Sequence, residues 1–396
     1  MSNLPSNWQV KSLGEVASVL TGYPFDSKLF SDNQGFPIIR IRDIKSGSTS
    51  TYYRGEVLKD YIIKKGDFLV GMDGEFNLAE WKSGDALLNQ RACKIIFDRQ
   101  FINPKFGYYF IPKKLKEIED STAYVTVKHI SHKQILNIQI PLPPLPIQKQ
   151  IAEILEKADQ AKQKRKEANE LTDEFLQSVF IEMFGDPVKN PKGWRKDELK
   201  SIAIIERDSV TSENLGKADL YIGLEHIEKE SGKLLGFEYV NEIDLKSNKF
   251  KFTSEHVLYG KLRPYLNKVC LPNFNGVCST DIIPIKPRQN ISDKYFLAFL
   301  MRMDFFVKEA TIKSAGANLP RISPNILEKF KVYVPPLSLQ QEFAEIVNKT
   351  EALKEKQKQS EQELENLFQS LMQKAFKGEL VGTQPPAPSL TKRRGV

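Results

Sequence analysis

The sequence predicts an α+β protein of two strand-rich domains in tandem, each followed by a long helix, with the two helices paired as a coiled coil. The first observation behind this prediction is an internal repeat. The segment PLPPLPIQKQIAEIL, from Pro141 to Leu155, returns 192 residues later as YVPPLSLQQEFAEIV, from Tyr333 to Val347. The match continues without a gap to Phe184, which falls on Phe376. Because the chain consists of two related halves, we expect it to act at two places on one partner.

Both copies begin with a pair of prolines and continue as strongly helical sequence. Proline fits the first turn of a helix but not its interior, so Pro143–Pro144 and Pro335–Pro336 predict where the two helices begin. Glycine commonly ends a helix, and Gly185 and Gly378 predict the two ends. The last segment is rich in proline and cations and is predicted to be disordered. The predicted limits are residues 1–146 and 185–338 for the two domains, 147–184 and 339–377 for the helices, and 378–396 for the tail.

The second observation is a coiled-coil pattern in both helices. Apolar or small residues recur at alternating steps of four and three from Ile147 to Val179 and from Leu339 to Leu371, for roughly four heptads in each copy. Arg165 and Gln357 occupy matching polar positions of this seam, and we interpret them as residues that set register. The larger apolar seam positions include Phe175, Leu353 and Leu367.

The third observation is that the segments before the helices also match. Trp8-x4-Leu13 recurs as Trp194-x4-Leu199, and Ile130-Ser131 recurs as Ile322-Ser323. Short alternating or β-branched runs, such as FPIIRIRDI, GDFLVGM and CSTDIIPI, are typical of strands. We therefore expect mixed, strand-rich domains with a few short helices, one of them from Tyr295 to Lys308.

The composition is that of a globular protein, with 40% hydrophobic and 27% charged residues. A net charge of +8 and a pI near 9.0 favour a polyanionic partner, although only weakly. No apolar run approaches the roughly 18 residues that a membrane span needs, so no membrane partner is expected. Cys93, Cys270 and Cys278 lack metal-ligand spacing and are expected to be reduced, buried thiols of a cytoplasmic protein.

The sequence lacks the common motifs of catalysis. It contains no G-x-x-x-x-G-K-[ST] phosphate loop and no nucleophile elbow. The proline pairs follow Leu142 and Val334, not the Asn or Asp of an amino-methyltransferase loop. His129-x-x-His132 is too short a pattern to be a metal site on its own. We therefore expect no catalytic residue, no metal and no cofactor in this chain.

The arrangement resembles the specificity subunit of type I restriction-modification systems. The resemblance lies in the W-x4-L near each domain start and in two longer signatures, Lys128 to Ile154 and Pro320 to Ile346. In both signatures an Ile-Ser pair precedes the helix entry P-L/V-P-P-L-x-x-Q-x-x-I/F-A-E-I. The resemblance covers nearly the whole chain, excluding only the C-terminal tail.

This resemblance implies that each domain is a target-recognition domain that reads one half of a split, asymmetric site in double-stranded DNA. It implies an antiparallel coiled coil that spaces the domains and docks two methyltransferase (modification) subunits. Those partners would bind S-adenosylmethionine and methylate adenine at N6. A motor-nuclease (restriction) subunit, with ATP and Mg²⁺, would cut unmodified DNA. The chemistry is therefore expected in the partner chains.

A domain that reads bases needs polar side chains at base edges and cations on phosphates. The loops GMDGEFN and GKLRPY occupy matching places after a strand, and they differ in every polar side chain. This is the pattern expected of one framework that displays two reading loops. Asp73 is expected either to accept a hydrogen bond from a cytosine amino group or to repel phosphate, and Arg263 to contact either a guanine edge or a phosphate. The candidate DNA-binding residues are Arg40, Arg42, Asp73, Glu75, Asn77, Asn89, Gln90, Arg91, Lys128, Lys261, Arg263, Tyr265, Ser279, Asn318 and Arg321.

Two other functions stay open on the sequence alone. One is a non-catalytic protein-interaction scaffold, with two β-rich binding domains on a coiled-coil spacer. The other is an enzyme with a cryptic site in one domain. Duplex binding that weakens steeply with salt would exclude the protein-only scaffold. Methyl transfer by the isolated chain would favour the enzyme.

Overall fold

The computed structural model describes residues 4–121, 128–216, 219–243, 245 and 247–381. The chain forms two compact units. The first contains residues 1–165 and 360–396, and the second contains residues 166–359. Each unit therefore combines one globular segment with a part of each long helix. Among the described residues, no helix is both long enough and apolar enough to cross a membrane.

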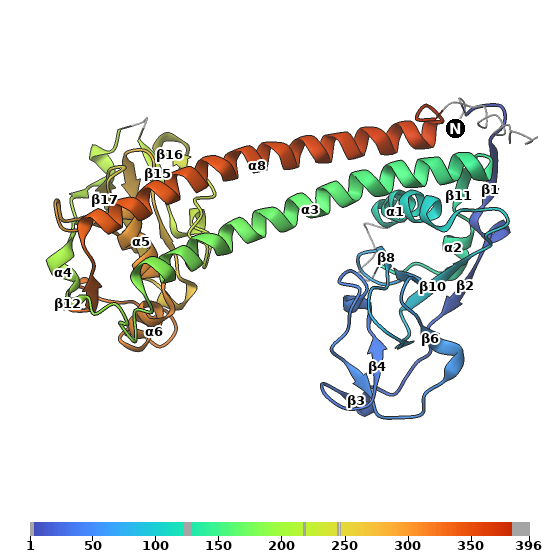
Figure 1. The fold of residues 1–396 in the computed structure, drawn as a ribbon, viewed down its shortest axis with the longest axis horizontal. Helices are drawn as coiled ribbons and strands as arrows, with labels where there is room; N and C mark the ends of the chain where they lie inside the picture. Colours follow the sequence, from blue (N-terminus) through green and yellow to red (C-terminus); the bar gives the residue numbers. More distant parts are fainter. Residues whose placement is uncertain (1–3, 122–127, 217–218, 244, 246, 382–396) are drawn as a thin grey trace, which may run out of the picture. The chain divides into compact units, whose positions relative to one another are not determined.

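Among the described residues of the first unit, the globular segment contains three small sheets and two α-helices (Figure 1). One antiparallel sheet has the strand order β2-β10-β7-β8, a second sheet has the order β3-β5-β4-β9-β6, and β1 pairs with β11. The elements are β1 (Gln9–Ser12), β2 (Ala17–Thr21), β3 (Phe30–Ser31), β4 (Phe36–Ile39), β5 (Tyr52–Tyr53), β6 (Ile62–Ile63), β7 (Phe68–Gly71), β8 (Leu78–Glu80), β9 (Ala86–Leu88), β10 (Ala92–Phe97), α1 (Pro104–Ser121), α2 (His132–Leu136) and β11 (Gln139–Leu142).

The second unit repeats this plan. Its sheets have the orders β13-β21-β18-β19 and β14-β17-β20-β15-β16, and β12 pairs with β22. In both units the larger sheet contains one parallel pair, β4 with β9 and β15 with β20. The elements are β12 (Arg195–Glu198), α4 (Leu199–Ile202), β13 (Ala203–Ile205), β14 (Ser209–Val210), β15 (Leu220–Ile222), β16 (Glu238–Tyr239), β17 (Lys249–Phe252), β18 (Val257–Gly260), β19 (Val269–Cys270), β20 (Gly276–Cys278), β21 (Ile282–Pro287), α5 (Lys294–Arg302), α6 (Asp304–Ile312), α7 (Pro324–Leu327) and β22 (Lys331–Val334).

The predicted pair of strand-rich domains is present, but the helix expected from Tyr295 to Lys308 is wrong as a single element. The structure divides it into α5 and α6, which meet at Met303. Met303 has φ −66° and ψ 144°, an extended conformation that interrupts the helix. Asp304 then provides the acidic first turn that favours a new helix start.

The two long helices are α3 (Leu145–Phe184) and α8 (Leu337–Lys377). Each begins directly after its pair of prolines, two residues before the start that the sequence predicted. Each ends before a glycine in the left-handed region, Gly185 with φ +82° and Gly378 with φ +78°. Part of the predicted disordered tail is packed, because Leu380 and Val381 contact the core of the first unit. Residues 382–396 lie outside the described residues.

Each unit contains a contact between its parts of α3 and α8. In the first unit, Lys162 Nζ lies 2.5 Å from a carboxylate oxygen of Glu365 and 4.3 Å from the ring centre of Phe368. In the second, Gln357 Nε2 donates a hydrogen bond of 3.1 Å to Thr172 Oγ1. Gln357 is therefore a polar residue of the helix contact, as predicted, while Arg165 is only half-buried.

The predicted seam is wrong at three of its large apolar positions. The side chains of Phe175, Leu353 and Leu367 are about half exposed, at 49%, 49% and 50%. The neighbouring Leu176 is buried instead, at 2% exposure. The reason is that each helix also covers a globular core, so its buried face is turned away from the direction that a simple two-helix seam would give. Leu155 is buried in the first core for the same reason.

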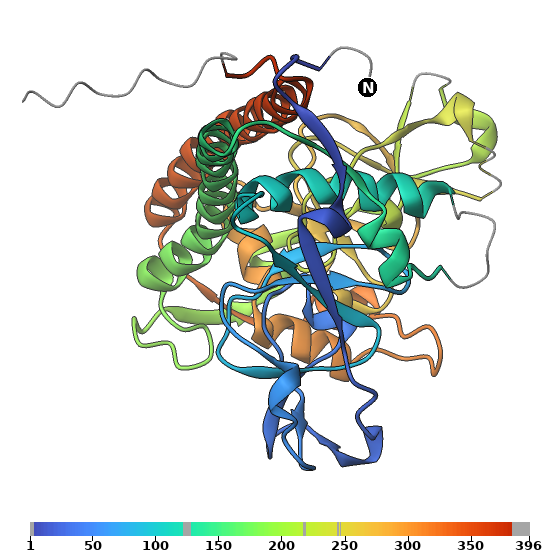
Figure 2. The same ribbon diagram turned by 90° about the vertical axis from the view of Figure 1, so that its right-hand side faces the viewer.

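The two cores are centred where the helices meet the globular segments. In the first unit α1 lies beside α3, as Figures 1 and 2 show, and Lys105 of α1 pairs with Glu156 of α3 at 3.1 Å. The ring of Phe376 in α8 lies 5.3 Å from that of Phe106 in α1. In the second unit Phe180 of α3 is 1% exposed and belongs to an aromatic cluster. The rings around Phe180 are those of Phe184, Phe296, Phe299 and Phe343.

The glutamine of the repeated helix entry is buried in both units. Gln148 is 1% exposed and Gln340 is 0% exposed. The amide oxygen of Gln148 accepts from the Asn103 N–H at 2.8 Å, and its nitrogen donates to the carbonyls of Phe101 and Pro143 at 3.0 and 2.8 Å. Gln340 makes the matching set of three hydrogen bonds. This side chain therefore fixes the first turn of each long helix to its globular segment.

Candidate nucleic-acid interface

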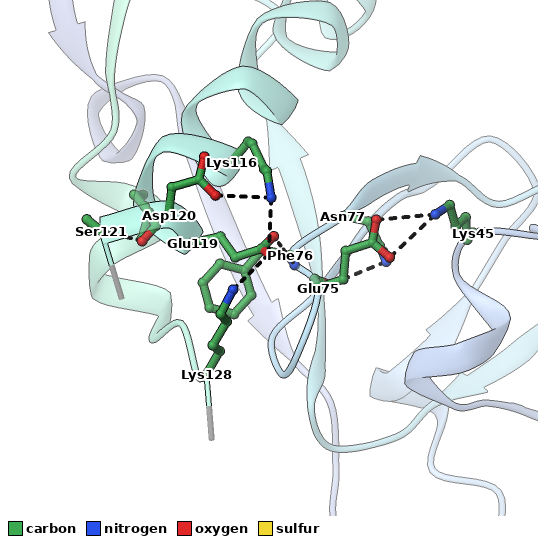
Figure 3. A network of polar contacts seen from close by, with 10 residues as sticks. Lys45, Glu75, Phe76, Asn77, Lys116, Glu119, Asp120, Ser121 and Lys128 are labelled. Carbon is green, nitrogen blue, oxygen red and sulfur yellow. Dashed lines mark hydrogen bonds and ion pairs between the residues drawn. The ribbon is translucent and has the colours of Figure 1, made fainter. Parts of the chain in front are cut away.

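The GMDGEFN loop follows strand β7 and is anchored by the side chains of Phe76 and Glu119. Phe76 is 4% exposed, and its backbone N–H donates to Glu119 Oε2 at 3.3 Å. Figure 3 shows Glu119 between this amide and the ammonium groups of Lys116 and Lys128, at 3.3 and 3.1 Å. The hydrogen bond from Lys128, aided by that from Lys116, lowers the pKa of Glu119. The loop is thus held in place by one apolar side chain and one buried carboxylate.

At the start of this loop, Asp73 joins two cationic or basic side chains. Nδ1 of His129 donates to Oδ1 of Asp73 at 2.6 Å, and Arg91 donates to Oδ2. Burial opposes the ionisation of Asp73, but the hydrogen bonds from His129 and Arg91 outweigh it, and the pKa of Asp73 is lowered. Arg91 has φ +72°, an uncommon conformation for a residue with a side chain. Each oxygen of Asp73 thus accepts one hydrogen bond.

The matching loop GKLRPY in the second unit carries a different set. Arg263 has φ +51° and is exposed, and Tyr265 is 50% exposed. Beside them, Arg321 makes a two-point ion pair with Asp281, through Nε to Oδ1 at 2.9 Å and Nη2 to Oδ2 at 3.2 Å. The Arg263 N–H donates to the carbonyl of Pro320 at 2.7 Å, so this loop lies beside the segment before Ile322.

Both loops are held by the same backbone hydrogen bonds. Each loop bonds at three points to two other segments of its own unit. In the first unit the bonds are Met72 N to Arg91 O, Gly74 N to Lys128 O and Ile130 N to Met72 O, at 2.8, 3.0 and 2.9 Å. In the second they are Lys261 N to Asp281 O, Arg263 N to Pro320 O and Ile322 N to Lys261 O, at 2.9, 2.7 and 3.0 Å.

This shared backbone framework makes three positions equivalent in the two units. They are residues 73, 91 and 129 in the first unit and residues 262, 281 and 321 in the second. The first unit places Asp, Arg and His at these positions, and the second places Leu, Asp and Arg. The framework is therefore common to both units, while the side chains that it presents differ.

Of the other candidates of the first unit, some are described by their exposure and the rest by contacts with neighbouring side chains. Gln90 is exposed, whereas Asn77 and Asn89 are half-buried. Arg40 lies 5.9 Å from the ring centre of Phe30. Further pairs link Arg42 to Thr51 at 3.4 Å, Glu75 to Lys45 at 3.2 Å and Lys128 to Glu119 at 3.1 Å.

Among the candidates of the second unit, Asn318 is exposed and Ser279 is half-buried. The hydroxyl of Ser279 accepts from the Asp281 N–H at 3.3 Å. Sequence reasoning missed His129 and Asp281. His129 could have been found, because it falls on Arg321 when the two Ile-Ser pairs are aligned. The equivalence of Asp281 and Arg91 follows only from the backbone hydrogen bonds of the folded units.

One group in the second unit has the composition of a metal site. The possible ligand atoms of Glu225, His226 and Glu238 lie within 4.8 Å of one another. However, Nδ1 of His226 accepts a hydrogen bond of 3.0 Å from the Gly223 N–H. In a neutral imidazole the other nitrogen, Nε2, then carries the proton and faces Glu238 at 3.8 Å. In this tautomer neither ring nitrogen offers a lone pair to a metal, so the geometry does not suit metal ligation.

The two units are thus related, with one backbone framework and different side chains on it. The family model for the type I restriction modification DNA specificity domain matches residues 5–173 and 191–366. The chain belongs to this family. A specificity subunit of such a system is a non-catalytic subunit for DNA sequence recognition, and it works in a complex with methyltransferase and restriction subunits.

Curated relatives agree with this assignment, and a solved structure has a similar fold. The chain is 28% identical to the type I restriction enzyme EcoBI specificity subunit of Escherichia coli, over 96% of this chain and 87% of that protein. It is 22% identical to the MjaVIII specificity subunit of Methanocaldococcus jannaschii, over 95% of this chain and 94% of that protein. The fold is similar to that of the type I S subunit from M. genitalium, with a TM-score of 0.58, 18% identity, and coverage of 95% of this chain and 97% of that one.

Proposed function

We propose that this subunit reads a bipartite, asymmetric site in double-stranded DNA, one half-site with each unit. The observation that carries the proposal is the shared backbone framework with its different side chains. Identical frameworks would place the two reading loops in the same way on DNA, while Asp73, Arg91 and His129 offer other hydrogen bonds than Asp281 and Arg321. We propose that the candidate DNA-binding residues, on these loops and elsewhere in the two units, contribute base and phosphate contacts.

We also propose that α3 and α8 form one antiparallel coiled coil that sets the distance between the half-sites. The helix contacts support this, because Lys162 meets Glu365 while the later Thr172 meets the earlier Gln357. Residue numbers thus rise along one helix as they fall along the other. The proposed partners on this spacer are two methyltransferase subunits and the motor-nuclease subunit. S-adenosylmethionine, and ATP with Mg²⁺, would bind to those partners, in the cytoplasm.

The test is to purify the full chain with the subunits that co-purify and to select bound duplexes from a randomised pool. The expected result is two unlike short motifs separated by an unread gap of fixed length, with two methyltransferase chains per specificity subunit. Binding should weaken steeply as salt is raised, because cations that contact phosphates release counterions. A pool that returns no motif, with binding indifferent to salt, would instead favour the protein-only scaffold.

A further inference from the structure

At the three equivalent positions both units pair a carboxylate with cationic or basic side chains, although the residues differ. In each unit a carboxylate lies inside and its cationic or basic partners lie outside. The side chain of Asp73 is 15% exposed, while those of Arg91 and His129 are 63% and 56% exposed. In the second unit Asp281 is 25% exposed and Arg321 is 43% exposed.

Each inner carboxylate already accepts a hydrogen bond on both of its oxygens. Asp73 uses one oxygen for His129 and the other for Arg91. Asp281 uses both oxygens for the fork of Arg321. A cytosine amino group could reach only the remaining lone pairs of these carboxylates, whose side chains are 15% and 25% exposed. The carboxylates are therefore poorly suited to direct reading.

Their partners, in contrast, keep hydrogen-bonding groups that point away from the carboxylate. His129 uses Nδ1, so Nε2 remains for another group. Guanidinium has five N–H donors, and the pair with Asp281 leaves some of those of Arg321 available. Fixing these long side chains before binding reduces the conformational entropy that is lost when they meet DNA.

We propose that Asp73 and Asp281 are positioning residues that orient Arg91, His129 and Arg321 for contact with base edges, and that His129 is a DNA-contacting residue. The proposal rests on the proposed function, because it assigns roles within the same DNA-facing surface. It differs from direct reading by Asp73, in which the carboxylate itself would touch the base. In the first unit the carboxylate at position 73 holds the side chains at 91 and 129, whereas in the second the carboxylate at 281 holds the side chain at 321.

The experiment uses the full chain with its co-purifying subunits and the randomised duplex pool. The variants are Asp73→Asn, Arg91→Ala and His129→Ala, singly and combined. If Asp73 acts through its partners, all three single changes should relax preference at the same base position or positions of one half-site, by about 5- to 150-fold in discrimination. The effect of Asp73→Asn should disappear when both partners are already alanine, a dependence that a merely structural role would not produce.

The second unit provides an independent arm of the experiment. Asp281→Asn and Arg321→Ala should relax one position of the other half-site and leave the first half-site unchanged. Matched controls remove one carboxylate from an exposed helix ion pair in the same unit. Glu153→Gln serves the first unit and Asp304→Asn serves the second, and both should keep the wild-type motif.

Several results would overturn the proposal. A new preferred base in Asp73→Asn, with Arg91→Ala and His129→Ala unchanged, would mean that the carboxylate reads the base directly. Wild-type motifs in all five variants would mean that these side chains do not contact bases. If the wild-type protein itself selects no motif, the proposed function fails instead, so the two failures can be told apart. Thermal unfolding of each variant identifies any that has lost its fold. In that case the variants of the other unit test the proposal.

Discussion

Replacing Gln340 by alanine should destabilise the second unit strongly, although the change removes a single uncharged side chain. Gln340 accepts a hydrogen bond of 2.9 Å from the Asp293 N–H. It donates to the carbonyls of Ile291 and Pro335 at 3.2 and 2.9 Å. Three buried hydrogen bonds, each with a net value of about 0.5–1.5 kcal/mol, give an expected loss of about 1.5–4.5 kcal/mol in the free energy of unfolding.

The assay is urea unfolding of the full chain, followed by circular dichroism, together with hydrogen exchange of the Asp293 amide. That amide loses its acceptor in Gln340→Ala and should exchange faster. The adjacent Gln341 is exposed on the same helix, so Gln341→Ala is the matched control and should change stability by less than about 0.5 kcal/mol. Gln148→Ala should reproduce the loss in the first unit. If Gln340→Ala were as stable as Gln341→Ala, the buried glutamine would not fix the helix start.

Four further predictions concern recognition and chemistry. Exchanging residues Trp8 to Leu142 for an unrelated target-recognition domain should change one half-site only, as sequencing of selected duplexes would show; a change in both would contradict the modular organisation. Inserting four residues after Phe175, about 6 Å of helix, should lengthen the unread gap by about one or two base pairs without altering the half-sites. Altered base preference at constant spacing would contradict the proposal that the helices set the distance between the half-sites. Arg263→Ala should cost about 1–3 kcal/mol at one base position if Arg263 reads guanine, whereas uniformly weaker binding with a smaller salt slope would identify a phosphate contact. The three buried cysteines have pKa values raised by burial, so at neutral pH they should react with a thiol reagent only after unfolding; fast labelling of the native protein would count against the packing described.

The architecture could be predicted from sequence because it depends on signals that act locally and occur twice. Proline pairs and glycines delimit α3 and α8 through backbone restrictions that neighbouring residues cannot override. The strand-rich plan follows from short β-branched runs. The buried Gln148 belongs to the repeated motif, but its role depends on carbonyls that only the folded chain brings to it. The sequence therefore shows the repeated motif but not the hydrogen bonds that its glutamine makes.

The errors arise where burial depends on tertiary partners. Phe175 and Leu176 are adjacent and both apolar, so periodicity alone cannot predict which one faces the core. In the structure Leu176 packs in the core of the second unit and Phe175 is exposed. The same holds for the candidate interface. Asp73 is 18 residues from Arg91 and 56 from His129, and only strand pairing brings the three together. The sequence could therefore predict the loop, but not the partners of its carboxylate.

The division of the first unit between both ends of the chain has a consequence for biosynthesis. The second unit is continuous, residues 166–359, and all of it has been synthesised before the last part of the first unit is made. Phe376 covers Phe106 and Phe110, with ring centres 5.3 and 5.0 Å apart, and it is among the last core residues to be translated. The domain that the ribosome makes first is thus the last to complete its core. Until α8 is finished, the nascent chain exposes an aromatic surface that a chaperone can bind, and chains that terminate before residue 360 should aggregate.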